Sequence, residues 1–185
     1  MESLTPSPQV KPYLIRPQGN FPGNERLPLL HYQGLFPEGG EQIADAIEER
    51  VGLHHWGNCW RWGIYDFHHY HSRAHEALVC YQGQARVQFG GPEGPVVEFK
   101  TGDAVVIPAG VAHCLLESEG DFEVVGCYPP GQKQDMKRDN PDDLAEANES
   151  IPQVPAPKTD PLYGTHGPLL QFWQLQEGHA DGPEA

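Results

Sequence analysis

Histidine and carboxylate side chains that could bind a metal ion gather in one short stretch of the chain, residues 63–83. His69 and His71 are two residues apart, a spacing that places both side chains on the same face of an extended strand. Glu76 follows a short polar segment and opens the apolar run 77–81. A strand, a turn and a returning strand would bring this carboxylate beside the two imidazoles. The stretch therefore predicts a nitrogen–nitrogen–oxygen metal site that lacks a further ligand.

A candidate for the missing ligand, His113, ends a second stretch, residues 102–113. Gly102 lies in a predicted tight turn, where a positive φ favours glycine. Residues 103–107 then form a short apolar run, and a Pro-Ala-Gly turn follows, with proline fixing φ at its first corner. His113 begins the next predicted strand, from which its imidazole could complete the site.

The two stretches together resemble the paired motifs of the cupin superfamily, G(X)5HXH(X)3-4E(X)6G and G(X)5PXG(X)2H(X)3N. Every defining position of the first motif is matched, by Gly63, His69, His71, Glu76 and Gly83. The second motif is matched by Gly102, Pro108, Gly110 and His113, but Glu117 stands at its last position in place of Asn. That Asn is not a ligand in the pattern, so its loss leaves the predicted metal site intact. The chain is also similar to small bacterial single-domain cupins of unassigned activity.

The resemblance implies an all-β fold, a single cupin β-barrel of the jelly-roll (double-stranded β-helix) type with a short N-terminal helix and a C-terminal extension. It implies metal ligation by His69, His71, Glu76 and His113. Glu76 is also the candidate catalytic residue, as a carrier of a proton. The implied cofactor is one divalent transition metal, and imidazole and carboxylate ligands are compatible with Fe, Mn, Ni, Co or Zn. The motifs are not repeated along the chain, which indicates one cupin unit.

The remaining pattern is that of many short strands. Apolar runs separated by Gly and Pro predict strands at 77–81, 84–89, 96–99, 103–107, 113–117 and 122–128. Breaks are expected at 82–83 and 119–120, among other turns. Apolar residues every four positions predict a helix over 41–51 that packs on the sheet, with Gly52 as its C-cap.

Aromatic residues precede the first motif and alternate with its ligands. Trp60 and Trp62 have the opposite parity to His69, so a continuous strand would turn them away from the metal, and a bulge would reverse this. Tyr65 and Phe67 share the parity of the ligands and are expected to line the pocket floor. In the intervening turn, Arg73 could bind an anionic substrate, and His75 is expected at the surface.

We divide the chain into an N-terminal arm and helix (1–55), a cupin core (56–130) and a C-terminal extension (131–185). The extension should contain a helix that begins with Asn140 as N-cap and Pro141 at its first position and ends at about Ser150. The apolar segment 169–173 should dock on the barrel or on a second subunit. The last dozen residues, from about Gln174, are expected to be disordered.

Composition restricts the partners. The 185 residues carry a formal net charge of −14, which disfavours nucleic acid and anionic membranes as partners. The first residues do not form a signal peptide, and no apolar run is long enough to span a membrane. The four cysteines lack CxxC spacing and are read as reduced, which predicts a cytoplasmic protein. A homodimer is expected, with the apolar C-terminal segment available for pairing.

These features leave several functions open. The favoured hypothesis is a metal-dependent enzyme of oxygenase type that acts on a small molecule with an enol-like or carboxylate-like group. A metal-dependent isomerase or decarboxylase is the first alternative. The others are a non-enzymatic protein that binds a small ligand and a protein in which the metal has a structural role.

Overall fold

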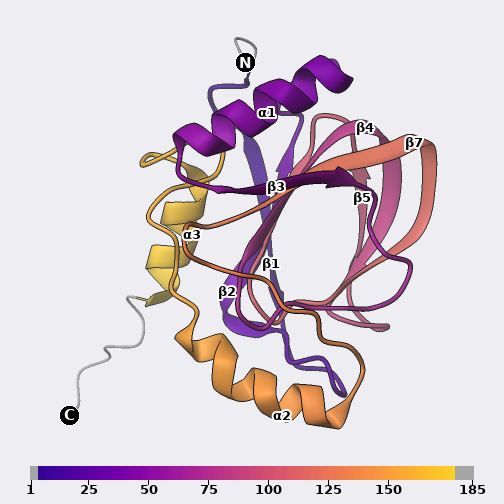
Figure 1. The fold of residues 1–185 in the computed structure, drawn as a ribbon, viewed down its shortest axis with the longest axis vertical. Coiled ribbons are helices and arrows are strands. Elements are labelled where there is room, and N and C mark those ends of the chain that lie inside the picture. Colours follow the sequence, from indigo (N-terminus) through magenta and orange to yellow (C-terminus); the bar gives the residue numbers. More distant parts are fainter. Residues whose placement is uncertain (1–3, 178–185) are drawn as a thin grey trace.

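A computed structural model describes residues 4–177 of the chain (Figure 1). In this part of the chain seven strands form one sheet with the order β1-β2-β6-β4-β7-β3, and β5 pairs with β4. The strands are β1 (Gln9–Ile15), β2 (Asn24–Gln33), β3 (Gly57–Trp62), β4 (Glu76–Phe89), β5 (Val96–Lys100), β6 (Ala104–Ile107) and β7 (His113–Tyr128). The helices are α1 (Glu41–Leu53), α2 (Pro141–Ser150), the short 3-10 helix η1 (Ile151–Gln153) and α3 (Pro168–Glu177). The predicted all-β fold with a few peripheral helices is confirmed.

Strand β4 is the centre of the sheet. One edge pairs with β6 and then with β5, while β7 runs antiparallel along the other edge. Its side chains alternate between two cores: Val79 and Tyr81 pack towards the helices, whereas Leu78 and Cys80 pack on the inside of the curved sheet. Because both faces are buried, the start of this strand has a continuous apolar sequence in place of a polar–apolar alternation.

The predicted breaks at 82–83 and 119–120 are wrong. Strands β4 and β7 continue through both positions, with irregular register near Gln82. Gly83 has a φ of 70° and Gly120 one of 66°, and a Cβ on Gly83 would lie 2.5 Å from the Glu119 carbonyl oxygen. The glycines therefore allow two long strands to bulge and bend at a close approach, where a turn would have ended them.

Gly102, the first glycine of the second motif, should tolerate replacement by alanine less well than Gly52 of α1. It has a φ of 92°, and an added Cβ would lie 2.5 Å from the Phe36 carbonyl oxygen. We expect Gly102→Ala to lower the free energy of unfolding by about 2 kcal/mol or more in urea titrations. The control Gly52→Ala adds its Cβ in open space within α1 and should be neutral or stabilise by about 0.5–1 kcal/mol. Equal losses in the two variants would contradict the strain argument.

The N-terminal region extends the sheet and covers it. Strand β1 pairs with β2, and β2 pairs with β6 at the edge of the motif strands. Of the predicted stripe of Ile43, Ile47 and Val51, helix α1 buries Ile47 and Val51 together with Ala44, and Ile43 is partly buried. It runs to Leu53, so Gly52 lies inside the last turn and is not the C-cap. Arg61 of β3 connects the helix to the sheet through ion pairs with Glu41, Asp45 and Glu48 at 2.9, 2.6 and 2.7 Å.

The C-terminal extension wraps around the same sheet. Helix α2 begins as predicted, with the Asn140 side chain accepting a hydrogen bond from Asp142 N at 2.8 Å. The apolar segment forms α3, which packs against β2 and buries Leu169 and Trp173 (Figure 1). Buried Asp160 supports this docking, because its Oδ2 accepts hydrogen bonds from the Tyr32 hydroxyl at 2.6 Å and from Leu169 N at 3.1 Å.

Two expectations about the C-terminus change accordingly. Residues 174–177 belong to α3, and the rest of the tail expected to be disordered, residues 178–185, lies outside the described part of the chain. The apolar segment is used within its own chain, so it no longer supports the expectation of a homodimer; the homodimer stays a prediction that a sedimentation mass can test. Over residues 4–177, none of the helices combines the length and apolarity needed to cross a membrane.

Candidate metal centre

The structure brings together the four residues that the motifs singled out. His69 and His113 form an isolated antiparallel bridge, with His113 N donating to His69 O at 2.9 Å. One ligand atom from each of His69, His71 and His113 lies within 4.8 Å of the others. Glu76, the first residue of β4, places its Oε2 3.2 Å from His71 Nε2 and 3.3 Å from His113 Nε2. All four residues are between 2% and 8% exposed, so the cluster is inside the fold.

The hydrogen bonds of the three Nδ1 atoms determine whether the Nε2 atoms have a lone pair for a metal ion. Each Nδ1 faces a backbone carbonyl oxygen, at 3.0 Å for His69 and 3.3 Å for His113. The carbonyl beside His69 belongs to Phe67, the one beside His71 to Asp135, and the one beside His113 to Val111. Because a carbonyl can only accept, each Nδ1 carries the proton, and a neutral ring then has a lone pair on Nε2. Metal-binding histidines are oriented in this way.

The two oxygens of Glu76 have different surroundings. Oε1 accepts a hydrogen bond from the Tyr128 hydroxyl at 2.9 Å, and that hydroxyl accepts one from Trp60 Nε1 at 2.9 Å. Oε2 is buried and has no hydrogen-bond partner among the described residues, although two imidazole nitrogens lie beside it. A buried anionic oxygen without a partner is costly, and a cation would satisfy it together with the imidazole lone pairs. The donor set therefore fits a divalent transition metal.

The pKa values of the cluster reflect two opposing effects, burial and the neighbouring charged groups. Burial alone would favour the neutral acid, but His71 and His113 outweigh it and hold the pKa of Glu76 well below its usual range. Burial, with His113 nearby, lowers the pKa of His69 to about 3. Burial also opposes a charge on His71, yet Glu76 outweighs that effect and raises the pKa of His71 to about 9. A proton on His71 and a metal ion therefore compete for the same carboxylate.

Tyr128 is a positioning residue that the sequence patterns did not indicate. Replacing it with Phe keeps the ring but removes both the donor to Glu76 Oε1 and the acceptor for Trp60 Nε1. We expect Tyr128→Phe to weaken metal binding by about 10- to 100-fold in competition with a coloured chelator. The control Tyr163→Phe removes a hydroxyl that donates to Thr5 O and should leave metal affinity unchanged. Wild-type affinity in Tyr128→Phe would contradict the positioning role.

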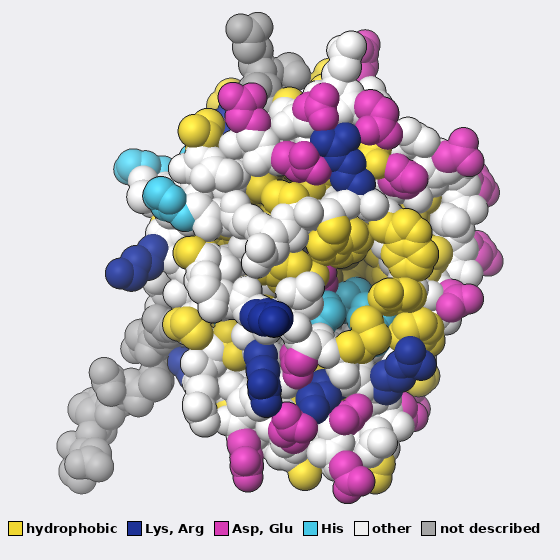
Figure 2. Space-filling view, viewed as in Figure 1, with side chains coloured by type: hydrophobic (Ala, Val, Ile, Leu, Met, Phe, Trp, Pro, Cys, Tyr) yellow, Lys and Arg dark blue, Asp and Glu magenta, His cyan; other side chains and the backbone are white. Residues whose placement is uncertain are grey.

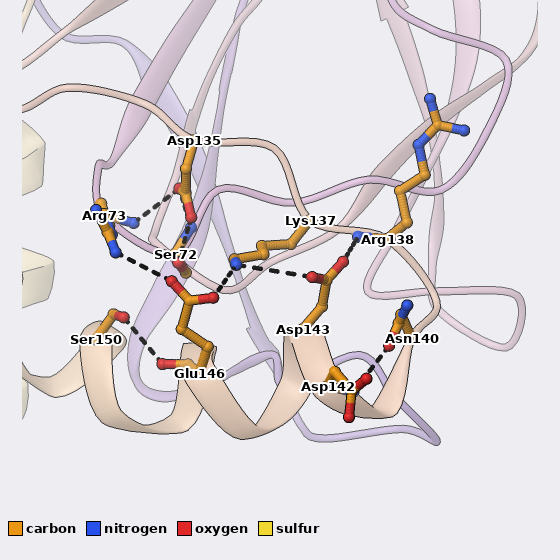
Figure 3. A network of polar contacts seen from close by, with 10 residues as sticks. All are labelled: Ser72, Arg73, Asp135, Lys137, Arg138, Asn140, Asp142, Asp143, Glu146 and Ser150. Carbon is orange, nitrogen blue, oxygen red and sulfur yellow. Dashed lines mark hydrogen bonds and ion pairs between the residues drawn. The ribbon is translucent and has the colours of Figure 1, made fainter.

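A segment of the C-terminal extension, residues 134–136, forms part of the site wall. The Asp135 carbonyl holds His71, and the Asp135 carboxylate accepts hydrogen bonds from Ser72 N at 2.7 Å and Arg73 N at 3.1 Å (Figure 3). Lys137 exchanges backbone hydrogen bonds with Tyr70. This clamp fixes the chain on both sides of His71. No local pattern could have indicated it, because Asp135 is 64 residues from His71 in the sequence.

The turn residues have different roles from those expected. Arg73 is not among the described residues that line the hollow above the cluster: its guanidinium pairs with Glu146 of α2 at 3.0 Å (Figure 3). The surface position expected for His75 is also wrong, since the side chain is buried against α3. His75 Nδ1 accepts a hydrogen bond from Ala109 N at 2.9 Å, and the ring lies 4.8 Å from that of Trp173.

A hollow of about 340 Å³ opens above the cluster. Figure 2 shows histidine side chains at its floor and hydrophobic side chains gathered around its rim. Trp60 and Trp62 line this hollow, which is the orientation expected where a bulge interrupts the strand. Strand β3 bulges between Gly57 and Trp60 and ends at Trp62, so side-chain parity is not transmitted to His69.

The two aromatic residues expected on the pocket floor have separate positions. Tyr65 lines the hollow as expected. Phe67 is not among the described residues that line it; its ring stacks on Tyr65 with the centroids 4.8 Å apart.

The sheet, the two motifs and the inward-facing histidines define a cupin, and the chain belongs to the cupin family. Residues 65–126 match the Cupin domain family. The chain is 41% identical over 165 residues to Uncharacterized protein YjlB of Bacillus subtilis (strain 168), a match that covers 89% of this chain and 97% of that protein. Among solved structures it resembles procruciferin, an 11S globulin from Brassica napus, with a TM-score of 0.35 and 13% identity. That match covers 83% of this chain and 36% of the globulin chain.

Proposed function

We propose that this cupin is a divalent-metal-dependent enzyme of oxygenase type that acts on a small molecule with an enol-like or carboxylate-like group. The observation that carries the proposal is the convergence of three imidazole rings and Glu76 Oε2 at the floor of an open hollow. A purely structural metal site is normally closed by protein ligands, whereas this cluster borders a space large enough for a small molecule.

In this proposal His69, His71, His113 and Glu76 hold the ion. When bound, a divalent ion would supply Lewis acidity, and Fe or Mn would also supply redox chemistry with O₂. Glu76 has a second proposed role as a proton carrier, since Tyr128 already directs its hydroxyl hydrogen at Oε1. The apolar side chains of Ile64 and Leu78 line the hollow near the ligands and limit the access of water.

Oxygen consumption by the metal-loaded protein tests the proposal. Protein loaded with Fe(II), Mn(II), Ni(II), Co(II) or Zn(II) would be incubated with a panel of diketones, thiols and phenols on an oxygen electrode. Oxygen uptake in proportion to substrate loss, absent in the His113→Ala variant, is the expected result. Turnover at an undiminished rate without O₂ would indicate the isomerase or decarboxylase instead. Tight capture of a ligand that is recovered unchanged would indicate a binding protein.

A further inference from the structure

We propose that the hollow binds a chelating ligand with one negative charge and a flat apolar body, which lies between Trp60, Trp62, Tyr65 and Met136. This inference rests on the proposed metal site and specifies its ligand: an aromatic or similarly planar molecule with a single metal-binding group. Three features of the hollow favour such a ligand: the side chains at its mouth, the fixed position of Trp60 and the surrounding charges.

The mouth of the hollow exposes large apolar side chains. Trp62 is 53% exposed, Tyr65 39% and Met136 45%, and all three line the hollow. The Trp62 and Tyr65 ring centroids are 5.0 Å apart, and the Tyr65 and His69 centroids are 5.3 Å apart. A series of aromatic contacts thus runs from the mouth to the metal ligand His69, and Figure 2 shows hydrophobic side chains beside the histidines of the hollow. Exposed apolar side chains gathered at one hollow indicate a binding surface, whereas single ones need no explanation.

Trp60 forms the inner wall of the hollow and is held in a fixed position. Trp60 packs directly over Gly126 of the neighbouring strand, where a Cβ would lie 2.2 Å from the indole ring. Its Nε1 donates to the Tyr128 hydroxyl at 2.9 Å. The indole is therefore fixed from one side by the missing side chain and at its edge by a hydrogen bond. A rigid aromatic wall binds a planar ligand without the cost of ordering a mobile side chain.

The charges around the hollow limit the ligand to one negative charge. Among the described residues that line it, none is Lys or Arg. Nearby cations are engaged elsewhere (Figure 3): Arg73 with Glu146 at 3.0 Å, and Lys137 with Glu146 at 2.6 Å and Asp143 at 3.7 Å. The Arg138 guanidinium lies over the Phe67 ring at 3.9 Å. A divalent ion beside the Glu76 carboxylate leaves one net positive charge at the ion, which one ligand anion neutralises, and the Asp135 carboxylate that also lines the hollow disfavours a second negative charge on the ligand.

Three hydroxamic acids that share one monoanionic metal-binding head test the inference. Acetohydroxamic acid has a methyl group, benzohydroxamic acid a phenyl ring, and 4-carboxybenzohydroxamic acid a phenyl ring with a second negative charge. Binding to Zn(II)-loaded protein would be measured by calorimetry and by quenching of tryptophan fluorescence, after the metal content has been determined. We expect benzohydroxamic acid to bind about tenfold or more tightly than acetohydroxamic acid, and the dianion to bind more weakly than benzohydroxamic acid.

Variants test whether the tighter binding of the phenyl compound arises from contacts in the hollow. Trp62→Ala should reduce the preference for the phenyl ring to about threefold or less without changing acetohydroxamic acid binding, and Trp62→Phe should restore most of it. The control Leu53→Ala removes a side chain that is 69% exposed on α1 and should change nothing. A phenyl ring that adds no affinity, a preference that survives Trp62→Ala, or tighter binding of the dianion would overturn the inference while leaving the metal site intact. Failure to load metal, or to bind even acetohydroxamic acid, would instead remove the proposed metal site.

Discussion

Replacing His113 with Ala should abolish stable metal binding. The change removes one of three imidazoles from a cluster whose ligand atoms lie within 4.8 Å of one another. It also removes one of the two nitrogens beside Glu76 Oε2. Loss of an outer partner of a metal ligand already costs about 10- to 100-fold in affinity, so loss of the ligand itself should cost more. Elemental analysis after dialysis should show about one ion per chain in the wild type and almost none in the variant.

The same variant should lose the stabilisation that metal provides. An ion that binds only the folded state adds about 4 kcal/mol at a concentration 1,000 times its dissociation constant. For a chain of this size that corresponds to a melting temperature about 10 °C higher in the wild type, and a chelator should reverse the shift. His113→Ala should melt at the same temperature with and without metal.

The matched control is His166→Ala, since His166 is exposed and its Nδ1 lies 3.1 Å from the hydroxyl oxygen of the neighbouring Thr165. This control should keep both the metal and the metal-dependent melting shift. Full metal content in His113→Ala, or equal loss in both variants, would mean that the cluster does not hold the ion. The His71→Ala variant, at the residue clamped by Asp135, provides an independent repetition.

The position of the site was predictable because the motifs place its residues at the ends of strands. Glu76 begins β4 opposite Ile107, the last residue of β6, and the short turn after Ile107 leads to His113 at the start of β7, so this pairing and this turn bring the two residues together. Helices α1 and α2 were equally predictable, from an apolar stripe in one case and from the Asn140-Pro141 start in the other. In all of these cases the signal is contained in a few consecutive residues.

Features that depend on distant segments were not predictable from local patterns. The direction of Trp60 depends on the β3 bulge and on the space that Gly126 leaves in another strand. A positive-φ glycine such as Gly83 serves a turn and a bulge equally well, so the sequence could not show that β4 continues. The burial of His75 depends on α3, which follows about 100 residues later and whose docking only the tertiary structure determines.

Helix α3 should prove to be part of the folded core, and Trp173→Ala is the change that tests this. Trp173 is 1% exposed, its Nε1 donates to Pro28 O at 3.0 Å, and its ring contacts that of His75. Truncation leaves a cavity between α3 and β2 and a carbonyl without its donor. We expect a loss of about 3–5 kcal/mol in the free energy of unfolding, measured by urea titration.

Two further variants separate the contributions of Trp173. Trp173→Phe keeps an aromatic ring but loses the indole donor to Pro28 O, so its loss should lie well below that of Trp173→Ala. Gln171→Ala, on the exposed side of the same helix, should change stability by less than about 0.5 kcal/mol. If Trp173→Ala is as stable as Gln171→Ala, α3 does not stabilise the sheet. If it is destabilised as expected, α3 is part of the folded core, where the Trp173 ring contacts His75, the residue that precedes the metal ligand Glu76.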